Sequence, residues 1–371
     1  MKILKQLSTK VVKPKKIVLL SGLLLGSLFN NAYAQDIHFS QITEAPLFLN
    51  PANTGLFEGY LRATVNYRNQ WTPMIQPYKT MAVSLDGVIG EKSKKKAYFG
   101  WGLNFFNDQA GASAYALNQV MGSFSAIVHL DPKNKICSAI GGGYGMRTAN
   151  YNNLTFGNQY NGTIFDPNVP SFETMQFNKF SYGEVNAGLQ WEFTKTDKAF
   201  DKDDNVDVKV GIAGYHLNQP LLKYYKYSQE KLPMRIVAEM AARIDIKGTK
   251  MSVLPSMIYM RQATFSELNL GTFLRVRFKN PTKTTGFKHE AGISLGMYLR
   301  PGDAIIPQMI IDMSGWSIGF AYDYNISSYK AVSRGNGGME ISLQWHSLRD
   351  ALFKRKREQG GGGHNNTHAT P

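Results

Sequence analysis

The feature of this sequence that most constrains its fold is a strict alternation of apolar with polar or small residues, repeated in segment after segment. In residues 316–325, for example, the apolar Trp316, Ile318 and Phe320 are each followed by a polar or small residue. Since successive side chains of a strand point to opposite faces, each such segment predicts a strand with one apolar face. Recurring over most of a chain, the pattern is typical of a transmembrane β-barrel whose apolar face meets lipid.

Fourteen segments are strand candidates, although 304–312 is apolar on both faces and 250–260 contains Pro255. An even number is what a single-chain bacterial barrel requires. The predicted fold class is all-β, a transmembrane antiparallel β-barrel. A soluble β-sandwich or propeller is the alternative, but the aromatic residues near the segment ends favour the barrel because such rings prefer the membrane interface. The predicted strands are 60–68, 79–89, 97–106, 118–130, 136–147, 182–194, 206–217, 233–246, 250–260, 265–278, 287–299, 304–312, 315–325 and 337–346.

The first 34 residues have the layout of a signal peptide. Six lysines precede the apolar run 17–29, and Ala32 and Ala34 supply small residues before a predicted cut at Gln35. The run is shorter than the roughly 20 apolar residues that a spanning helix needs. We therefore expect an exported chain with four parts: a signal peptide (1–34), an N-terminal segment (35–59), the barrel (60–346) and a basic, Gly-rich flexible tail (347–371).

The net charge of +15 would be a reason to consider nucleic acid as a partner. Removing the six signal-peptide lysines lowers it to about +9, and an exported barrel meets outer-membrane lipid and protein partners instead. The single cysteine, Cys137, excludes a disulfide framework within the chain. We expect no nucleic-acid binding.

No catalytic, metal or cofactor site is predicted. The glycines of 141–145 lack the following helix and the Lys-Ser/Thr of a phosphate-binding loop. His364 and His368 are four residues apart, but nothing around them would hold a metal-binding geometry. No Ser/His pair with an orienting carboxylate falls on one predicted rim. The chain is therefore not expected to be an enzyme.

The alternation places charged residues of both signs on the predicted inner face of the barrel. One interpretation is an ion-selective pore. The other, which we favour, is a paired network inside the lumen, because charges away from water must be paired. Closure of the barrel would place the last strand beside the first and so bring Glu340 near Arg62. The residues concerned are Arg62, Arg68, Glu184, Glu192, Arg275, Arg277, Asp323 and Glu340.

An even number of strands places both ends of the barrel on the periplasmic side, and the connections then differ between the two sides. Those on the terminus side are short and rich in lysine, as in 90–96, where Lys92, Lys94, Lys95 and Lys96 are candidates for docking an acidic periplasmic partner. The opposite loops include the long, aromatic 148–181 and 217–231. Short periplasmic turns and longer outer loops are typical of outer-membrane barrels.

Both ends of the mature chain resemble the PorP/SprF family, outer-membrane proteins of the type IX secretion system of Bacteroidetes. The matching stretches are QDIHFSQITEAPLFLNPANTG (35–55), LRATVNYRNQW (61–71) and YDYNISSYKAVSRGNGGMEISLQW (322–345). The basic, Gly-rich tail departs from the family pattern. The motif residues carried over are Phe39, Ser40, Gln41, Asn50, Pro51, Asn66, Tyr67, Arg68, Asn69, Gln70, Trp71, Asn325, Ser327, Ser328, Gly337, Gly338, Glu340, Ile341 and Ser342.

The resemblance implies an outer-membrane protein of secretion and gliding motility, with two kinds of partner. They are secreted cargo carrying a C-terminal sorting domain, such as a gliding adhesin, and periplasmic components of the type IX machinery. We expect the aromatic outer loops to dock the cargo, with Tyr224, Tyr225 and Tyr227 as candidate contacts because buried aromatic residues dominate interface energetics. A passive porin and, less favoured, a barrel hydrolase are the alternatives.

The N-terminal segment 39–59 poses a packing problem. Pro46 and Pro51 break any regular element, yet Leu47, Phe48 and Leu49 are too apolar to lie in water. We therefore expect the segment to be ordered against the barrel, either folded into the periplasmic mouth of the lumen or forming part of the rim beside the first strand.

Overall fold

The computed structural model describes residues 36, 38–70, 77–90, 96–150, 154–173, 179–195, 205–224, 227, 229–279, 291–328 and 330–347. The predicted signal peptide and nearly all of the tail lie outside these residues. The same is true of Trp71, Lys92, Lys94, Lys95 and Tyr225.

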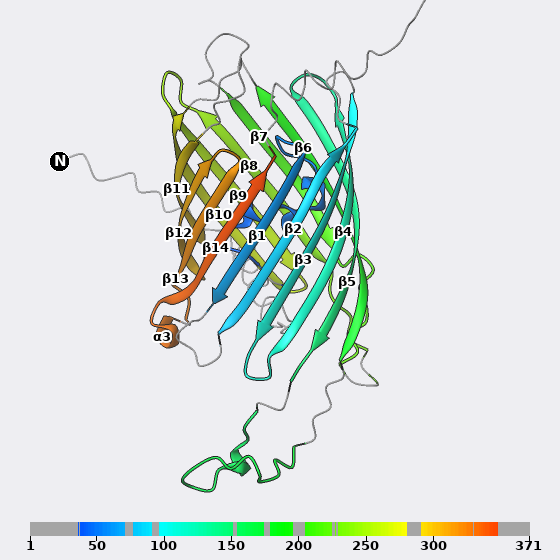
Figure 1. The fold of residues 1–371 in the computed structure, drawn as a ribbon, viewed down its shortest axis with the longest axis vertical. Coiled ribbons are helices and arrows are strands. Elements are labelled where there is room, and N and C mark those ends of the chain that lie inside the picture. The colour runs from blue at the N-terminus through cyan, green and yellow to red at the C-terminus, as the bar shows by residue number, and fades with distance from the viewer. Residues whose placement is uncertain are drawn as a thin grey trace, which may run out of the picture.

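Within the described residues, fourteen antiparallel strands form one closed barrel, which confirms the predicted fold class (Figure 1). Each strand pairs with its neighbours in sequence, and β1 pairs with β14 to close the ring. The strands are β1 (Leu61–Gln70), β2 (Tyr78–Ile89), β3 (Ala97–Ala110), β4 (Tyr115–His129), β5 (Asn134–Thr148), β6 (Phe180–Lys195), β7 (Val206–Tyr215), β8 (Arg235–Asp245), β9 (Met251–Gln262), β10 (Phe265–Lys279), β11 (Ala291–Arg300), β12 (Ala304–Met313), β13 (Trp316–Asn325) and β14 (Asn336–His346).

The pairing of β1 with β14 is the closure seam, and it runs from Arg62 opposite His346 to Gln70 opposite Gly338. β1 begins and β14 ends at the same end of the barrel, here called the terminus end, which is the upper end in Figure 1. The other end, the loop end, carries the short helix α3 (Lys330–Ser333) and the described residues 154–173 with η4 (Gly157–Gln159).

The barrel wall is apolar outside and polar inside. Along β13 exposed and buried residues alternate without exception, so that Trp316, Ile318 and Phe320 face outward while Ser317 and Asp323 face the lumen. This is the arrangement that lipid outside and a packed polar interior require. The lumen also holds an apolar patch around Phe273, Tyr298 and Ile306, which explains why 304–313 is apolar on both faces.

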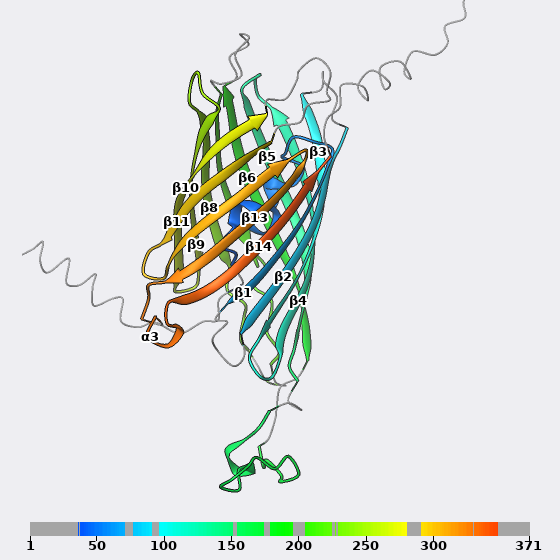
Figure 2. The ribbon, with the colours of Figure 1, turned by 60° about the vertical axis from the view of Figure 1, so that its left-hand side comes forward.

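The lumen contains residues 38–59, here called the plug, which Figure 2 shows inside the ring of strands. The plug forms three short helical turns, η2 (Ile42–Glu44), α2 (Pro46–Leu49) and η3 (Pro51–Asn53). Each proline stands at the first position of its turn, where a missing N–H costs nothing. Asn50 caps η3 by accepting a hydrogen bond from the Ala52 N–H at 2.9 Å. None of the described helices is long and apolar enough to cross a membrane.

Glycines in the wall make room for the plug. A Cβ added to Gly100 would lie 2.6 Å from the Thr54 carbonyl oxygen and 3.0 Å from the Gly55 Cα, both plug backbone atoms. At Gly188 an added Cβ would lie 2.1 Å from the Asn50 Oδ1. The wall therefore fits the plug at backbone distance, where any side chain would collide.

The plug extends further than a segment packed at the periplasmic mouth. Asp36, which precedes it, lies against His216 beyond the loop-end terminus of β7, whereas Gly55 donates its N–H to Asp86 in the terminus half of the barrel, at 2.9 Å. The segment thus follows the lumen lengthwise. Leu47 and Leu49 are buried there and Phe48 packs against buried neighbours, which resolves the packing problem that they pose in the sequence.

Candidate functional site: the plug and the closure seam

Three family-motif stretches that are far apart in the sequence meet at the closure seam. The strand register places Arg68 of β1 directly opposite Glu340 of β14. The Glu340 carboxylate accepts hydrogen bonds from the backbone N–H of Ser40 at 2.7 Å and of Gln41 at 3.0 Å. The Gln41 side chain donates to the Glu340 carbonyl at 2.9 Å and accepts from the Ser342 hydroxyl at 2.6 Å. The plug is thereby tied to the last strand.

Arg68 binds the same part of the plug from the first strand. Its guanidinium donates to the Ser40 hydroxyl at 2.8 Å and to the His38 carbonyl at 3.1 Å. It forms an ion pair with Asp323 at 2.9 Å and lies 3.6 Å from the Glu340 carboxylate. The Ser40 hydroxyl in turn donates to Asp323 at 2.8 Å. One plug serine therefore joins β1, β13 and β14.

Arg300 of β11 completes this network from the neighbouring wall. It donates to the Ser40 hydroxyl at 3.1 Å and pairs with Glu267 at 3.3 Å and with Asp303 at 2.8 Å. Gln308 of β12 donates to the Ser40 carbonyl at 2.9 Å. Sequence reasoning missed these residues, although the inward positions of Glu267 and Arg300 in alternating strands are a usable signal.

The network is almost closed to water. The side chains of Arg68 and Glu340 are 3% and 1% exposed. Burying a charge without a partner is strongly unfavourable, so Arg68 and Glu340 can be buried in the lumen only because these contacts compensate their charges. The arrangement supports a paired internal network rather than an ion-selective pore.

The C-terminal part of the plug is bound to the wall at other points. Asn50, which is 0% exposed, donates to Glu239 at 2.9 Å. Arg62 donates to the Asn53 carbonyl at 3.0 Å and pairs with Asp86 at 2.8 Å. The expectation that Arg62 lies near Glu340 is therefore wrong, because the stagger of the barrel places Arg62 opposite His346 instead.

At the loop end His216 holds the residue that precedes the plug. Its Nε2 lies 2.6 Å from the Asp36 carboxylate, and its Nδ1 forms an ion pair with Glu184. Burial lowers the pKa of His216, but the two carboxylates outweigh that effect and raise the pKa to about 9. The stabilisation that protonated His216 gives the folded state through these two ion pairs is therefore fully present below its unfolded-state pKa of about 6.5. It is lost as the pH rises through about 9.

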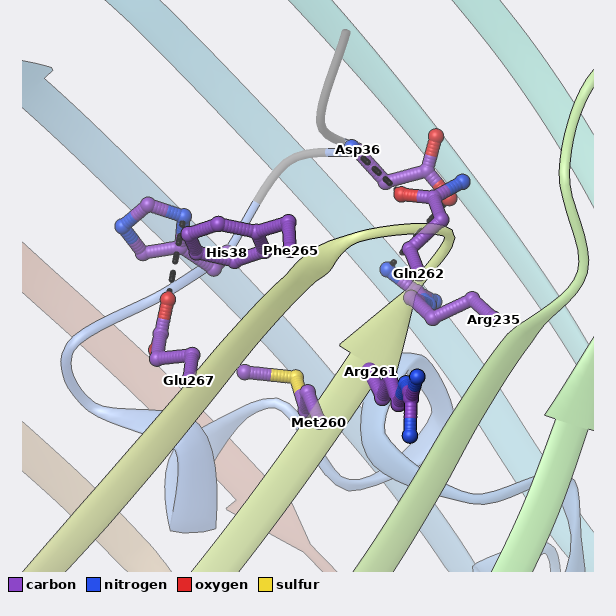
Figure 3. A pocket seen from close by; sticks show the side chains of 8 residues that line it. All are labelled: Asp36, His38, Arg235, Met260, Arg261, Gln262, Phe265 and Glu267. Atoms are coloured by element: carbon purple, nitrogen blue, oxygen red, sulfur yellow. Dashed lines mark hydrogen bonds and ion pairs between the residues drawn. The ribbon is translucent and has the colours of Figure 1, made fainter. Parts of the chain in front are cut away.

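A small cavity of about 20 Å³ lies beside Asp36 and His38, lined also by Arg235, Gln262 and Glu267 (Figure 3). Its volume suits one or two water molecules rather than an organic ligand. Within the described chain, no group of three or more His, Cys, Asp or Glu side chains is placed to hold a metal ion.

The remaining motif residues divide between the wall and the loop end. Asn66 is fully buried facing the lumen, whereas Tyr67 and Ile341 face outward. Ser327 donates to Asn325 at 2.8 Å beyond the end of β13. Gly337 lies too close to the backbone of β13 for any side chain, because an added Cβ would lie 2.6 Å from the Asp323 carbonyl oxygen.

The candidate docking residues differ in how far they are buried. Tyr224 is partly buried. It packs edge-on against Phe180 at 5.0 Å and against the buried cluster that includes Phe39, whereas Tyr227 is 76% exposed. Lys96, the only docking lysine within the described residues, is exposed at the terminus end.

The family model for the type IX secretion system membrane protein PorP/SprF matches residues 31–345 of this sequence. The chain belongs to the PorP/SprF family. It is therefore an outer-membrane barrel of the type IX secretion system, a secretion component rather than a member of a known enzyme family. The three motif stretches of this PorP/SprF protein are the ones that meet at the closure seam.

No curated protein matches the sequence. Among solved structures, the chain is similar to the toluene transporter TodX of P. putida, with 8% identity, a TM-score of 0.43 and coverage of 82% of this chain and 94% of that one. It is also similar to BamA from Haemophilus ducreyi lacking POTRA domains 1–3, with 9% identity, a TM-score of 0.40 and coverage of 78% and 70%.

Replacing Glu340 with alanine should destabilise the barrel strongly. The change leaves Arg68 with one acidic partner fewer and leaves the N–H groups of Ser40 and Gln41 without their acceptor, so the loss in unfolding free energy should be about 3–5 kcal/mol. Urea unfolding of the purified barrel in detergent, followed by tryptophan fluorescence, measures it. The control is Met339→Ala on the outer face of the same strand; equal losses for both variants would contradict the role given to Glu340.

Proposed function

We propose that this PorP/SprF protein works as a docking platform that helps to export or anchor a surface protein with a C-terminal sorting domain, such as a gliding adhesin. The observation that carries the proposal is the filled lumen. The plug is bound by β1, β2, β8, β12 and β14, and glycines in the wall fit its backbone. A segment held from this many strands obstructs the lumen, which argues against a passive porin. The surfaces left for secretion are the two ends of the barrel.

The loop end offers apolar side chains to a partner. Within residues 154–173, a short hairpin joins Tyr160 to Phe165 by an isolated bridge, and Ile164 and Phe165 stay exposed on it. Phe172 is 85% exposed. Exposed aromatic residues gathered at one end are typical of interaction surfaces. We therefore assign the cargo contact to these residues together with Tyr227, and give Tyr224 a packing role.

Replacing Ile164, Phe172 and Tyr227 together with serine should reduce cargo at the cell surface about tenfold or more, because a few large apolar anchors carry most of the binding energy of an interface, about 2 kcal/mol or more for the strongest. Antibody labelling of the cargo on whole cells measures the effect. The matched control replaces Thr163 and Asn168, exposed polar residues of the same loop, with serine. Normal display and retention of cargo by the triple variant would refute the contact.

The terminus end is the second docking surface in this proposal. Exposed lysines of its turns include Lys96, Lys133, Lys247 and Lys250. The nearby Asp131 is engaged in its own turn, where it accepts hydrogen bonds from the N–H groups of Lys133 and Asn134. Such a basic rim suits an acidic periplasmic component of the secretion machinery.

Reversing Lys92, Lys94, Lys95 and Lys96 to glutamate should lower the amount of periplasmic component that co-purifies with the barrel, because attraction becomes repulsion. Quantitative mass spectrometry of the detergent-solubilised complex gives the readout. Reversal of Lys223 and Lys231, which are exposed at the loop end, is the control and should leave the amount unchanged. An intact complex after the first reversal would remove the docking role of these lysines.

A further inference from the structure

The connection between β7 and β8 folds back on itself over the loop end of the lumen. Its described residues from His216 to Leu232 are here called the cap. Leu221 and Lys231 form a bridge, the Leu222 N–H donates to the Glu230 carbonyl at 2.7 Å, and the Leu232 N–H donates to the Pro220 carbonyl at 2.9 Å. These bonds give the cap a defined inner face.

The inner face of the cap packs on the plug. Leu222 and Leu232 are buried in one apolar cluster with Phe39 and Ala45 of the plug, and Phe48 packs against this cluster. At the root of the cap, His216 binds the Asp36 carboxylate at 2.6 Å. The cap therefore contacts the plug through both an apolar and an ionic interaction.

The ionic contact lies across the barrel from the closure seam, whereas the apolar cluster also includes wall residues such as Ala82 of β2, Phe106 of β3 and Phe180 of β6. In the ring of fourteen strands, β7 is seven positions from β14, which is the opposite side. The N-terminal half of the plug is thus clamped between Glu340 on one side and the cap on the other. Its C-terminal half is held separately, by Glu239, Asp86 and Ser125.

We infer that the cap is a latch for the N-terminal half of the plug: when the cap lifts, residues 42–48 loosen, while Ser40 and Gln41 stay bound at the closure seam and residues 50–56 stay bound to the wall. A partner that buries Leu222 and Leu232 in its own apolar surface binds only the lifted cap, and by linkage its binding loosens this half of the plug. This inference rests on the proposed function only in naming a docked cargo as that partner. Through the cap, binding of a partner at the outer surface changes how firmly this half of the plug is held in the lumen.

Hydrogen exchange of the purified full mature barrel in detergent tests the latch without any cargo. The variant Leu222→Ser/Leu232→Ser removes the apolar contact, and Leu221→Ser, at an exposed neighbouring position of the same loop, is the control. We expect amides of residues 44–48 to exchange about tenfold faster or more in the double variant, since serine cannot replace the apolar contact of a buried leucine. Amides of residues 53–56 and of the strands should keep their rates.

A second variant, Asp36→Asn, removes the ionic contact with His216 together with the longer ion pair to Arg235 of β8 at 3.7 Å, and should change the same amides in the same direction. Unchanged exchange of 44–48 in both variants overturns the latch. Equal acceleration in 44–48, in 53–56 and in the strands also overturns it, because the cap would then stabilise the whole barrel. Loss of the latch leaves the docking proposal standing, because cargo display on cells is measured independently.

Discussion

The rest of the structure depends on the pairing of buried charges between the plug and the closure seam. Glu340 and Arg68 face a lumen that is closed to water around them, and each is compensated by plug backbone as well as by side chains. Neither charge is tolerable without such partners. Barrel closure and the seating of the plug are therefore one event in physical terms, because the residues that close the ring are the ones that bind the plug.

Because the buried charges depend on the plug, the predicted family-motif residues have a structural role. Ser40, Asn50, Arg68 and Glu340 are distant in sequence, yet each holds the plug or the wall around it. These residues thus specify a filled barrel, and in the proposed docking role its two ends are the working surfaces. An exposed apolar surface at the loop end and a basic rim at the terminus end fit a docking component of a secretion machine.

Much of the fold could be predicted from the sequence, because each strand has a period that local residues reveal. All fourteen predicted strands occur within the described residues, and even the two-faced apolar segment around Ile306 is a strand. The contacts across the lumen could not be predicted, since they depend on how neighbouring strands are staggered around the barrel, which no local pattern encodes. The expected proximity of Arg62 and Glu340 is wrong for this reason, because the residue opposite Glu340 is Arg68. The inward glycines, such as Gly100 and Gly188, alternate visibly in the sequence, but their purpose is evident only once the plug lies against them.

If the plug fills the lumen, as proposed, the barrel serves secretion by docking rather than by conduction. Ion conductance of the purified barrel in planar lipid bilayers tests this claim most directly, with an open porin of similar strand number as the positive control. The account predicts no steady conductance from the wild-type protein over the voltages at which the porin conducts. A steady conductance comparable to that of the porin would contradict it.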